Sequence, residues 1–222
     1  MTAADLSRVV ALVPVRSLSG AKSRLGEPLD PEERADLILA LLRRTVEAAR
    51  AARRLAGVLV VSLDPELLER ARAMGAATLR QESDGLNEAL VEARLAACGT
   101  AGLAAGAATA VVALPADLPG ITASAIDRLA QTAERALREA PDRPVVVLVP
   151  DRHGSGTNAL LLAPPTAIDF CFGEGSRSAH AKAAGAAGAT YLELDGPLSF
   201  DVDTPDDLLE ADRRGLDHEA GR

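Results

Sequence analysis

Aromatic residues are scarce in this chain of 222 residues: they make up 2% of it, and there is no tryptophan. Proteins that bind single-stranded nucleic acid use aromatic rings as platforms on which bases stack, so we do not expect that function. Positive charge is also in deficit, because the formal net charge is −8. A negative surface attracts neither nucleic acid nor an anionic membrane. Basic residues must therefore be concentrated locally if the chain binds phosphates.

Cysteine is nearly missing as well. Cys98 and Cys171 are the two that occur, far apart and in no C-x-x-C arrangement, which indicates neither a zinc site nor a disulfide framework. The chain also lacks an apolar run near the ~20 residues of a membrane span and a signal-peptide pattern at its N-terminus. We therefore expect a cytoplasmic protein with no membrane partner. The length suits one domain over residues 1–216, with 217–222 as a flexible tail.

Short apolar runs alternate with helical patterns along most of the chain. The first run, 8–14, is continuous and rich in β-branched residues, as in a strand covered on both faces. Strands are expected at 8–14, 57–63, 77–80, 109–114, 145–150, 158–163 and 190–194. Helices are expected at 30–54, 64–74, 85–97, 122–139 and 177–187, and from 203 onward. The alternation predicts an α/β fold with a Rossmann-like, mostly parallel sheet flanked by helices.

A basic loop follows the first predicted strand. It carries Arg16, Gly20, Lys22 and Arg24. Ligands of open parallel sheets bind beyond the carboxyl ends of the strands, so these residues are candidates for contacts to nucleotide phosphates. A solvated basic loop is the alternative. The loop matches neither the P-loop nor G-x-G-x-x-G, so it indicates neither ATPase nor dinucleotide chemistry.

Three aspartates are candidates for a magnesium site. Asp117 follows a predicted buried strand and lies between Pro115 and Pro119, which restrict the backbone around it. Asp201 and Asp203 are two positions apart on an extended segment, so their side chains point the same way. Mg²⁺ prefers hard oxygen ligands, commonly one or two carboxylates together with phosphate oxygens. For Asp203, the cap of the last predicted helix is an alternative role.

Two glycine-rich loops lie in the last third of the chain. Thr157, Gly173 and Ser176 belong to them, and exposed N–H groups and hydroxyls in such loops can form an anion site. Structural turns explain the glycines equally well. His153 and His180 show no metal spacing and no nucleophile partner, so we expect surface or loop histidines.

Six segments taken in order carry a family resemblance. They read ALVPVRSLSGAKSRL, SDGLNEAL, LPADLP, GSGTNALLL, FGEGSRSAH and FDVDTPDDL. Together they resemble the 2-phospho-L-lactate/phosphoenolpyruvate guanylyltransferases of coenzyme F420 biosynthesis, over nearly the whole chain. The resemblance implies a fold of the nucleotide-diphospho-sugar transferase type, related to molybdenum-cofactor guanylyltransferases.

The resemblance also implies roles for particular residues. Lys22 and Arg24 would contact the phosphates of GTP and act in catalysis with Asp117. Gly85 and Asn87 would lie on the guanine side, and Asp117, Asp201 and Asp203 would hold magnesium. Thr157, Gly173 and Ser176 match the positions for a phosphorylated three-carbon acid. Arg16 stands where many relatives carry lysine, which keeps the positive charge but changes its geometry.

The implied reaction joins GMP from GTP to the phosphate of phosphoenolpyruvate and releases pyrophosphate. The Ala- and Arg-rich composition favours a high-GC bacterium and hence phosphoenolpyruvate, with 2-phospho-L-lactate or 3-phosphoglycerate as alternative acceptors. A molybdopterin or sugar-phosphate nucleotidyltransferase would carry a G-G-x-S-x-R-M-G-x-x-K type of loop, which this chain lacks. A ligand sensor would leave the three aspartates without purpose. The sequence does not fix the oligomeric state, and a homodimer is compatible with it.

Overall fold

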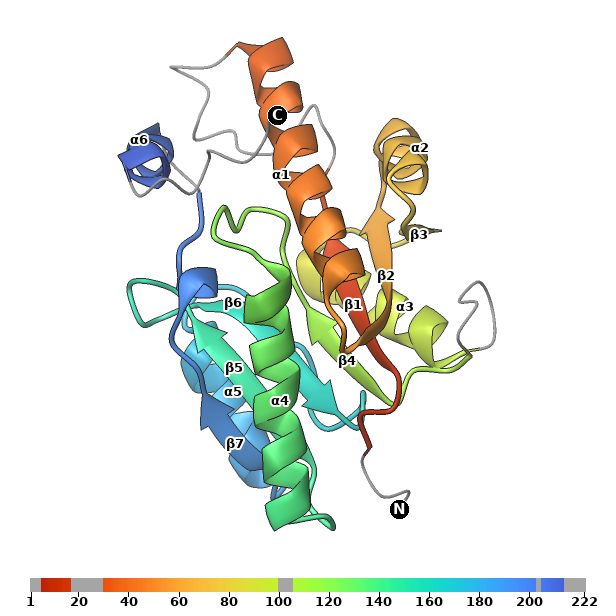
Figure 1. Ribbon diagram of the computed structural model, residues 1–222, viewed down its shortest axis with the longest axis vertical. Helices are drawn as coiled ribbons and strands as arrows, with labels where there is room; N and C mark the ends of the chain where they lie inside the picture. The colour runs from red at the N-terminus through yellow and green to blue at the C-terminus, as the bar shows by residue number, and fades with distance from the viewer. Residues whose placement is uncertain (1–4, 17–29, 100–105, 203–204, 214–222) are drawn as a thin grey trace.

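A single seven-stranded sheet forms the centre of the molecule (Figure 1). The computed structural model describes residues 5–16, 30–99, 106–202 and 205–213. Its strands are β1 (Val9–Pro14), β2 (Leu55–Ser62), β3 (Ala77–Arg80), β4 (Ala110–Ala113), β5 (Val145–Pro150), β6 (Thr157–Ala163) and β7 (Thr190–Glu193). Their order across the sheet is β3-β2-β1-β4-β6-β5-β7. The seven expected strands are thus confirmed within two residues at their ends.

One strand runs against the others. β1 pairs in parallel with β2 and β4, β2 with β3, and β5 with β7. β6 is antiparallel to both of its neighbours, β4 and β5. The sheet is therefore mostly parallel, as expected. Because β6 is reversed, its beginning lies at the edge where the parallel strands end, so Thr157 and Asn158 stand at that edge.

Helices cover both faces of the sheet (Figure 1). They are α1 (Pro31–Ala51), α2 (Pro65–Ala73), α3 (Leu86–Cys98), α4 (Ala123–Glu139), α5 (Ser176–Ala186) and α6 (Pro205–Arg213), with a 3-10 helix, η2, at Pro197–Ser199. Val9, Ala11 and Val13 pack with α1, α2 and α4. Val10 and Leu12, on the opposite face of the same strand, pack with α3 and α5. Burial of β1 on both faces explains its continuous apolar run.

The helix starts follow local hydrogen-bonding rules. Asp30 accepts from the N–H groups of Glu32 and Glu33, while Glu33 reaches back to the N–H of Asp30 and completes a capping box. Asp64 accepts from the first turn of α2 in the same way, and Thr122 caps α4. The helices expected to begin near 30, 64 and 122 are thus confirmed. The cap of α6 lies outside the described residues.

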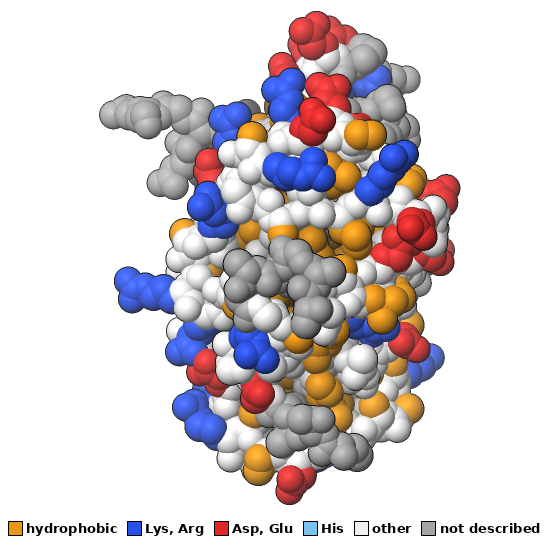
Figure 2. Space-filling view, turned by 90° about the vertical axis from the view of Figure 1, so that its right-hand side faces the viewer, with side chains coloured by type: hydrophobic (Ala, Val, Ile, Leu, Met, Phe, Trp, Pro, Cys, Tyr) orange, Lys and Arg blue, Asp and Glu red, His pale blue; other side chains and the backbone are white. Residues whose placement is uncertain are grey.

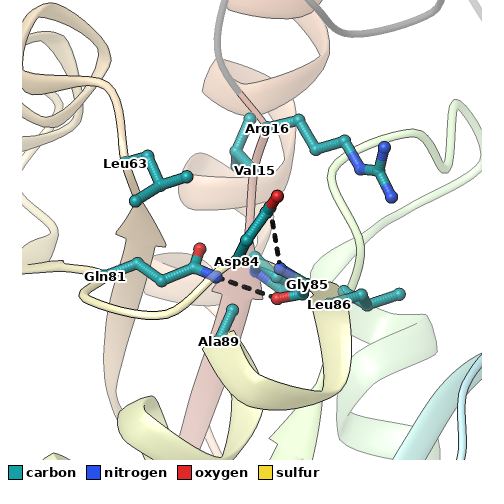
Figure 3. Close-up of a pocket in the computed structure, with 9 residues that line it drawn as sticks. Val15, Arg16, Leu63, Gln81, Asp84, Gly85, Leu86 and Ala89 are labelled. Carbon is teal, nitrogen blue, oxygen red and sulfur yellow. Dashed lines mark hydrogen bonds between the residues drawn. The ribbon is translucent and has the colours of Figure 1, made fainter.

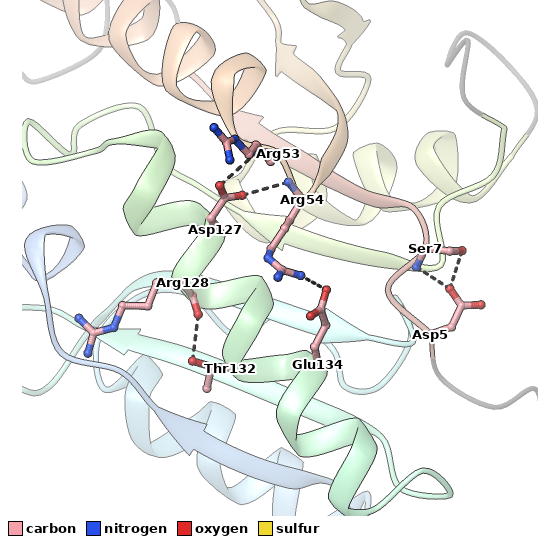
Figure 4. Close-up of polar contacts among 8 residues, drawn as sticks. All are labelled: Asp5, Ser7, Arg53, Arg54, Asp127, Arg128, Thr132 and Glu134. Carbon is pink, nitrogen blue, oxygen red and sulfur yellow. Dashed lines mark hydrogen bonds and ion pairs between the residues drawn. The ribbon is translucent and has the colours of Figure 1, made fainter.

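The start of β2 is held against α4 (Figure 4). The Asp127 carboxylate accepts from the backbone N–H of Arg53, at 3.3 Å, and of Arg54, at 3.0 Å. The Arg54 side chain also forms an ion pair with Glu134, two turns farther along α4. These contacts tie the turn between α1 and β2 to a helix that follows it by about seventy positions.

The surface charge, the search for a membrane-spanning helix and the C-terminal tail are the remaining points raised by the sequence. Acidic and basic side chains are interspersed over the face drawn in Figure 2. Among the residues that the structure describes, no helix is long and apolar enough to cross a membrane. The expected tail, 217–222, lies outside the described residues, so it stays a prediction together with the domain bounds.

Candidate active site

Two segments that carry predicted metal ligands meet at the carboxyl edge of the sheet. Asp117 lies in the turn that follows β4, and Asp201 follows η2. The backbone N–H of Val202 donates to the carbonyl of Asp117 at 3.0 Å. Both carboxylates are half-buried. The structure therefore brings together two of the three predicted aspartates from positions more than eighty residues apart.

A glycine permits a second contact between these segments. A Cβ atom built on Gly120 would lie 2.4 Å from the carbonyl oxygen of Pro197 in η2. No side chain fits at such a distance, so the turn after β4 approaches η2 through bare backbone. The Asp117 turn and the Asp201 segment are thus held together at two points.

Asn158 holds the segment that carries Asp201 by two hydrogen bonds. It lies on β6, is 6% exposed, and donates from Nδ2 to the carbonyl of Leu198 at 3.1 Å and to Oδ1 of Asp201 at 3.3 Å. Sequence reasoning did not assign this residue a role. The available signal was a single amide at the start of an otherwise apolar strand, TNALLLA.

Arg152 also contacts the segment that carries Asp201. Its guanidinium lies 4.9 Å from the centre of the Phe200 ring and forms an ion pair with Asp207 of α6. The Asp207 side chain is almost fully buried. A buried carboxylate requires such a partner, because an unpaired charge is strongly disfavoured away from water. Arg152 therefore connects the loop after β5, the Asp201 segment and the last helix.

The two predicted anion loops also meet. Thr157 begins β6 and Ser176 begins α5, and both side chains are buried. The Ser176 N–H donates to the carbonyl of Gly173 at 3.2 Å, and the N–H of Arg177 donates to the carbonyl of Ser155 at 3.2 Å. The loops of Thr157 and of Ser176 are thus neighbours, although binding of an acid by them stays a prediction.

His180 is buried, contrary to the expectation of a surface or loop histidine. It lies in α5, and its Nε2 accepts from the backbone N–H of Cys171 at 2.9 Å. The proton of the neutral ring is therefore on Nδ1, which lies 3.1 Å from the Thr157 hydroxyl and donates to it. Burial lowers the pKa of His180 to about 4, so the ring is neutral at pH 7. His153 is exposed, as expected.

Arg177 ties the β5–β6 loop to α5 and β7. Its Nε and one terminal nitrogen donate to the Glu193 carboxylate, at 2.9 and 2.6 Å, and the other donates to the carbonyl of Gly154 at 2.9 Å. The hydrogen bond from Arg177 lowers the pKa of the Glu193 carboxyl. The two-point contact fixes the guanidinium, which in turn holds the loop that leads into Thr157.

A cavity of about 220 Å³ opens beyond the ends of β1, β2 and β3 (Figure 3). Its lining is mainly apolar, with a few polar groups, and consists of Pro14, Val15, Arg16, Leu63, Gln81, Asp84, Gly85, Leu86 and Ala89. Gly85 caps α3 with a φ of 112°, a region that only glycine occupies readily. Arg16 and Gly85, both predicted nucleotide-binding residues, thus lie at one cavity.

Asn87 has a structural partner. Its Oδ1 accepts from the N–H of Phe172 at 2.8 Å, and its Nδ2 donates to the carbonyl of the same residue at 3.0 Å. The side chain therefore ties the start of α3 to the loop before α5. One amide hydrogen remains for another acceptor, so contact with a nucleobase stays a prediction.

Four predicted site residues lie outside the described residues. They are Gly20, Lys22, Arg24 and Asp203. Among the residues that the structure describes, no group of three or more His, Cys, Asp or Glu side chains is close enough to hold a metal ion. Asp117 and Asp201 thus form a pair of candidate ligands within the described part of the chain.

Comparison with known proteins places the chain in a family. The family described as "Guanylyl transferase CofC like" matches residues 9–220. The chain is 49% identical over 208 residues to a phosphoenolpyruvate guanylyltransferase of Rubrobacter xylanophilus, a match that covers 93% of this chain and 95% of that protein. It is 46% identical over 202 residues to a protein of the same name from Sphaerobacter thermophilus, covering 90% of this chain and 91% of that one.

Solved structures agree with the fold. A protein of Desulfovibrio desulfuricans G20 described as a nucleotide-diphospho-sugar transferase superposes with a TM-score of 0.69 at 19% identity, covering 96% of this chain and 90% of that chain. A CMP:2-keto-3-deoxy-manno-octonic acid synthetase complexed with CTP gives a TM-score of 0.60 at 18% identity, covering 96% and 100%. The fold is of the expected nucleotidyltransferase type, and the chain belongs to the guanylyl transferase CofC like family.

Proposed function

We propose that this chain transfers GMP from GTP to the phosphate of phosphoenolpyruvate, giving enolpyruvoyl-2-diphospho-5'-guanosine and pyrophosphate in coenzyme F420 biosynthesis. The observation that carries the proposal is the meeting of Asp117 and Asp201 through the Val202–Asp117 backbone hydrogen bond. Support also comes from relatives named phosphoenolpyruvate guanylyltransferase, which match nearly the full chain at 49% and 46% identity. A cytoplasmic location is part of the proposal.

The two described aspartates suit Mg²⁺. Their carboxylates are hard oxygen ligands on adjacent segments, and Mg²⁺ commonly uses one or two carboxylates while phosphate oxygens complete its coordination. Asp117 and Asp201 would hold the ion, and Asp203 would join them. Bound there, Mg²⁺ would neutralise charge on the triphosphate.

The residues of the chain would act mainly by positioning the two substrates. An oxygen of the acceptor phosphate attacks the α-phosphorus of GTP, a new P–O bond forms, and the bond to the β-phosphate oxygen breaks to release pyrophosphate. The attacking oxygen is already an anion, so no protein base needs to remove a proton. Lys22 and Arg24 would stabilise the negative charge of the leaving pyrophosphate.

The acceptor substrate, phosphoenolpyruvate, would bind at the neighbouring loops of Thr157 and of Ser176. Thr157 and Ser176 begin neighbouring elements, and the N-terminal end of α5, where the helix dipole is positive, favours an anion. His180 is neutral at pH 7 and holds the Thr157 hydroxyl at 3.1 Å. Its role in this proposal is to orient Thr157 rather than to exchange protons with substrate.

Product analysis tests the proposal. The purified chain is incubated with GTP and Mg²⁺ and, in parallel, with phosphoenolpyruvate, 2-phospho-L-lactate or 3-phosphoglycerate, and products are identified by mass spectrometry. We expect a guanylylated product and pyrophosphate with phosphoenolpyruvate. If 2-phospho-L-lactate or 3-phosphoglycerate is turned over faster than phosphoenolpyruvate, that acid is the acceptor instead. Absence of a guanylylated product with all three acids would refute it.

A further inference from the structure

The loop between β6 and α5 is held through its backbone by two side chains. The Cys171 N–H donates to Nε2 of His180 at 2.9 Å. The next residue, Phe172, donates from its N–H to Oδ1 of Asn87 at 2.8 Å, and its carbonyl accepts from Nδ2 of Asn87 at 3.0 Å. Asn87 belongs to the first turn of α3, on the same face of the sheet as α5. Two consecutive residues of the loop are therefore fixed by side chains from two different helices.

The contact between Asn87 and the Phe172 carbonyl also determines where the next N–H group points. The peptide bond between Phe172 and Gly173 is trans. A planar trans peptide directs its carbonyl oxygen and its N–H to opposite sides. Because the carbonyl faces Asn87, the Gly173 N–H points away from Asn87. A side chain on α3 thus sets the direction of a donor in the loop that leads to α5.

The Gly173 N–H is available to a ligand. Gly173 is exposed, and within the described part of the chain no acceptor takes its N–H. Its carbonyl, in contrast, accepts from the N–H of Ser176 at 3.2 Å, so the backbone is held on both sides of the glycine. Its φ of 127° favours glycine, and apart from the adjacent residues nothing lies within 4 Å of the place of a Cβ atom. Gly173 thus offers an oriented donor at an accessible position.

His180 joins this loop to the loop that leads into β6. It holds Cys171 through Nε2 and the Thr157 hydroxyl through Nδ1, the latter at 3.1 Å. The edge of one ring meets the face of the other between Phe172 and His180, with ring centres 5.1 Å apart. Backbone N–H groups and hydroxyls in fixed directions are the groups that bind phosphate and carboxylate oxygens. The arrangement suits an anion that contacts both loops.

We propose that Asn87 is a positioning residue for the acceptor acid, because its hold on Phe172 directs the Gly173 N–H to an anionic oxygen of that acid. The inference rests on the proposed function, in which the acid binds at the loops of Thr157 and of Ser176. It differs from the nucleobase contact that the family resemblance implies for Asn87, since both polar atoms of this side chain are engaged by Phe172.

Two substitutions of Asn87 test the proposal. Asn87→Ala removes both contacts to Phe172, whereas Asn87→Asp keeps an acceptor for the Phe172 N–H and removes the donor to its carbonyl. Both should raise the KM for the acid about tenfold at saturating GTP, as for loss of one hydrogen bond to a charged group. The kcat should stay within about threefold of wild type, because the Gly173 contact would be equally strong in the ground state and the transition state.

Glu92→Ala is the matched control. Glu92 lies on the same helix and also holds a loop by two backbone contacts, accepting from the N–H groups of Glu82 at 2.8 Å and Ser83 at 2.9 Å. That loop precedes α3, so the control removes a comparable pair of hydrogen bonds without touching Phe172. It should leave the KM for the acid unchanged. An equal rise of this KM in Glu92→Ala would indicate general loosening of the fold and would overturn the specific role of Asn87.

A measurement on the wild type does not depend on whether a variant folds. The ¹⁵N-labelled chain is saturated with Mg²⁺ and α,β-methylene-GTP, whose bridging carbon blocks the reaction, and phosphoenolpyruvate is then titrated while amide signals are followed by NMR. The Gly173 amide proton should move downfield and exchange more slowly with solvent, because it gains an anionic acceptor. A Gly173 signal that stays in place while those of Thr157 and Ser176 shift would overturn the inference.

The outcomes separate this inference from the proposed function. GTP is titrated by calorimetry without acceptor, and its affinity should change by less than about threefold in Asn87→Ala. Weaker GTP binding with a normal KM for the acid would assign Asn87 to the nucleotide and overturn the positioning role, even though the wild type makes guanylylated product. Failure of the wild type to guanylylate any of the three acids would instead contradict the proposed function, and this inference with it.

Discussion

The amide nitrogen of Asn158 donates to Oδ1 of Asp201 at 3.3 Å and to the carbonyl of Leu198 at 3.1 Å. One buried side chain on β6 thus controls both the direction of a candidate metal ligand and the backbone that carries it. The two amide hydrogens serve one acceptor each, so neither contact can be removed without loss. Asn158 is therefore a positioning residue for Asp201.

Substitution of Asn158 by Ala should loosen Asp201. We expect a higher Mg²⁺ concentration for half-maximal activity, a kcat lower by about tenfold, and a free energy of unfolding lower by about 1–3 kcal/mol, because the buried Leu198 carbonyl loses its donor. Pyrophosphate release measured against Mg²⁺ concentration, together with urea denaturation, checks both effects. Thr132→Ala is the matched control, because Thr132 is a buried donor to a backbone carbonyl in α4. It should lower stability without changing the Mg²⁺ requirement, and an unchanged requirement in Asn158→Ala would exclude the positioning role.

Substitution of Asp117 by Asn should nearly abolish turnover. It removes a ligand charge with little change in side-chain size, and each tenfold loss of rate corresponds to about 1.4 kcal/mol of barrier. We expect less than about a tenth of the wild-type rate, with circular dichroism and thermal stability close to wild type. Asp142→Asn, at an exposed loop position, is the control and should keep full activity. Retention of most of the wild-type rate by Asp117→Asn would rule out its metal-ligand role.

Substitution of Ser176 by Ala should affect the acceptor more than GTP. The Ser176 side chain is 2% exposed at the first position of α5, next to the loop of Thr157. We expect an acceptor KM raised roughly tenfold at saturating GTP, and unchanged GTP affinity in a titration without acceptor. Ser178→Ala, at an exposed position of the same helix, is the control. Loss of GTP binding with a normal acceptor KM would reverse the assignment of the two subsites.

Acidification should destabilise the protein through His180. In the folded chain its pKa is about 4, against 6.5 for the ordinary group, so the unfolded state binds the proton first as the pH falls. Stability therefore falls between pH 6.5 and 4, by up to about 1.4 kcal/mol per pH unit and roughly 3 kcal/mol in total.

Urea denaturation between pH 7.5 and 4.5 checks this slope. His180→Gln should flatten it, because glutamine carries no titrating proton, although the variant starts from a lower stability. His153→Gln, at the exposed histidine, should leave the slope unchanged. A slope that survives in His180→Gln would have to come from other groups and would contradict the prediction.

Local patterns predicted much of the fold. The caps at Asp30, Asp64 and Thr122 act within three residues, so the sequence displays both partners of each hydrogen bond. The continuous apolar run of β1 likewise reports burial on both faces. The reversed direction of β6 and its place between β4 and β5 depend on pairing across the sheet, which no short segment encodes.

The site was predictable to a smaller extent. The proline-flanked turn of Asp117 marked the end of a strand, as the structure confirms, whereas Asp201 follows the 3-10 helix η2 and not a strand. The backbone hydrogen bond from Val202 to Asp117 brings the two segments together. The clamp by Asn158 and the burial of His180 result from partners 40 and 23 positions away along the chain. Nothing in the neighbourhood of either residue shows that partner, so their roles required the three-dimensional arrangement.

The order in which the site is completed follows from the backbone hydrogen bond between Val202 and Asp117. During synthesis, which proceeds at roughly 5–20 residues per second, the Asp117 turn and β6 leave the ribosome well before the Asp201 segment. A nascent chain that ends before Phe200 already contains all seven strands but only one of the two described carboxylates. The second carboxylate is therefore added only after the seven described strands, so chains that stop before Asp201 should not consume GTP.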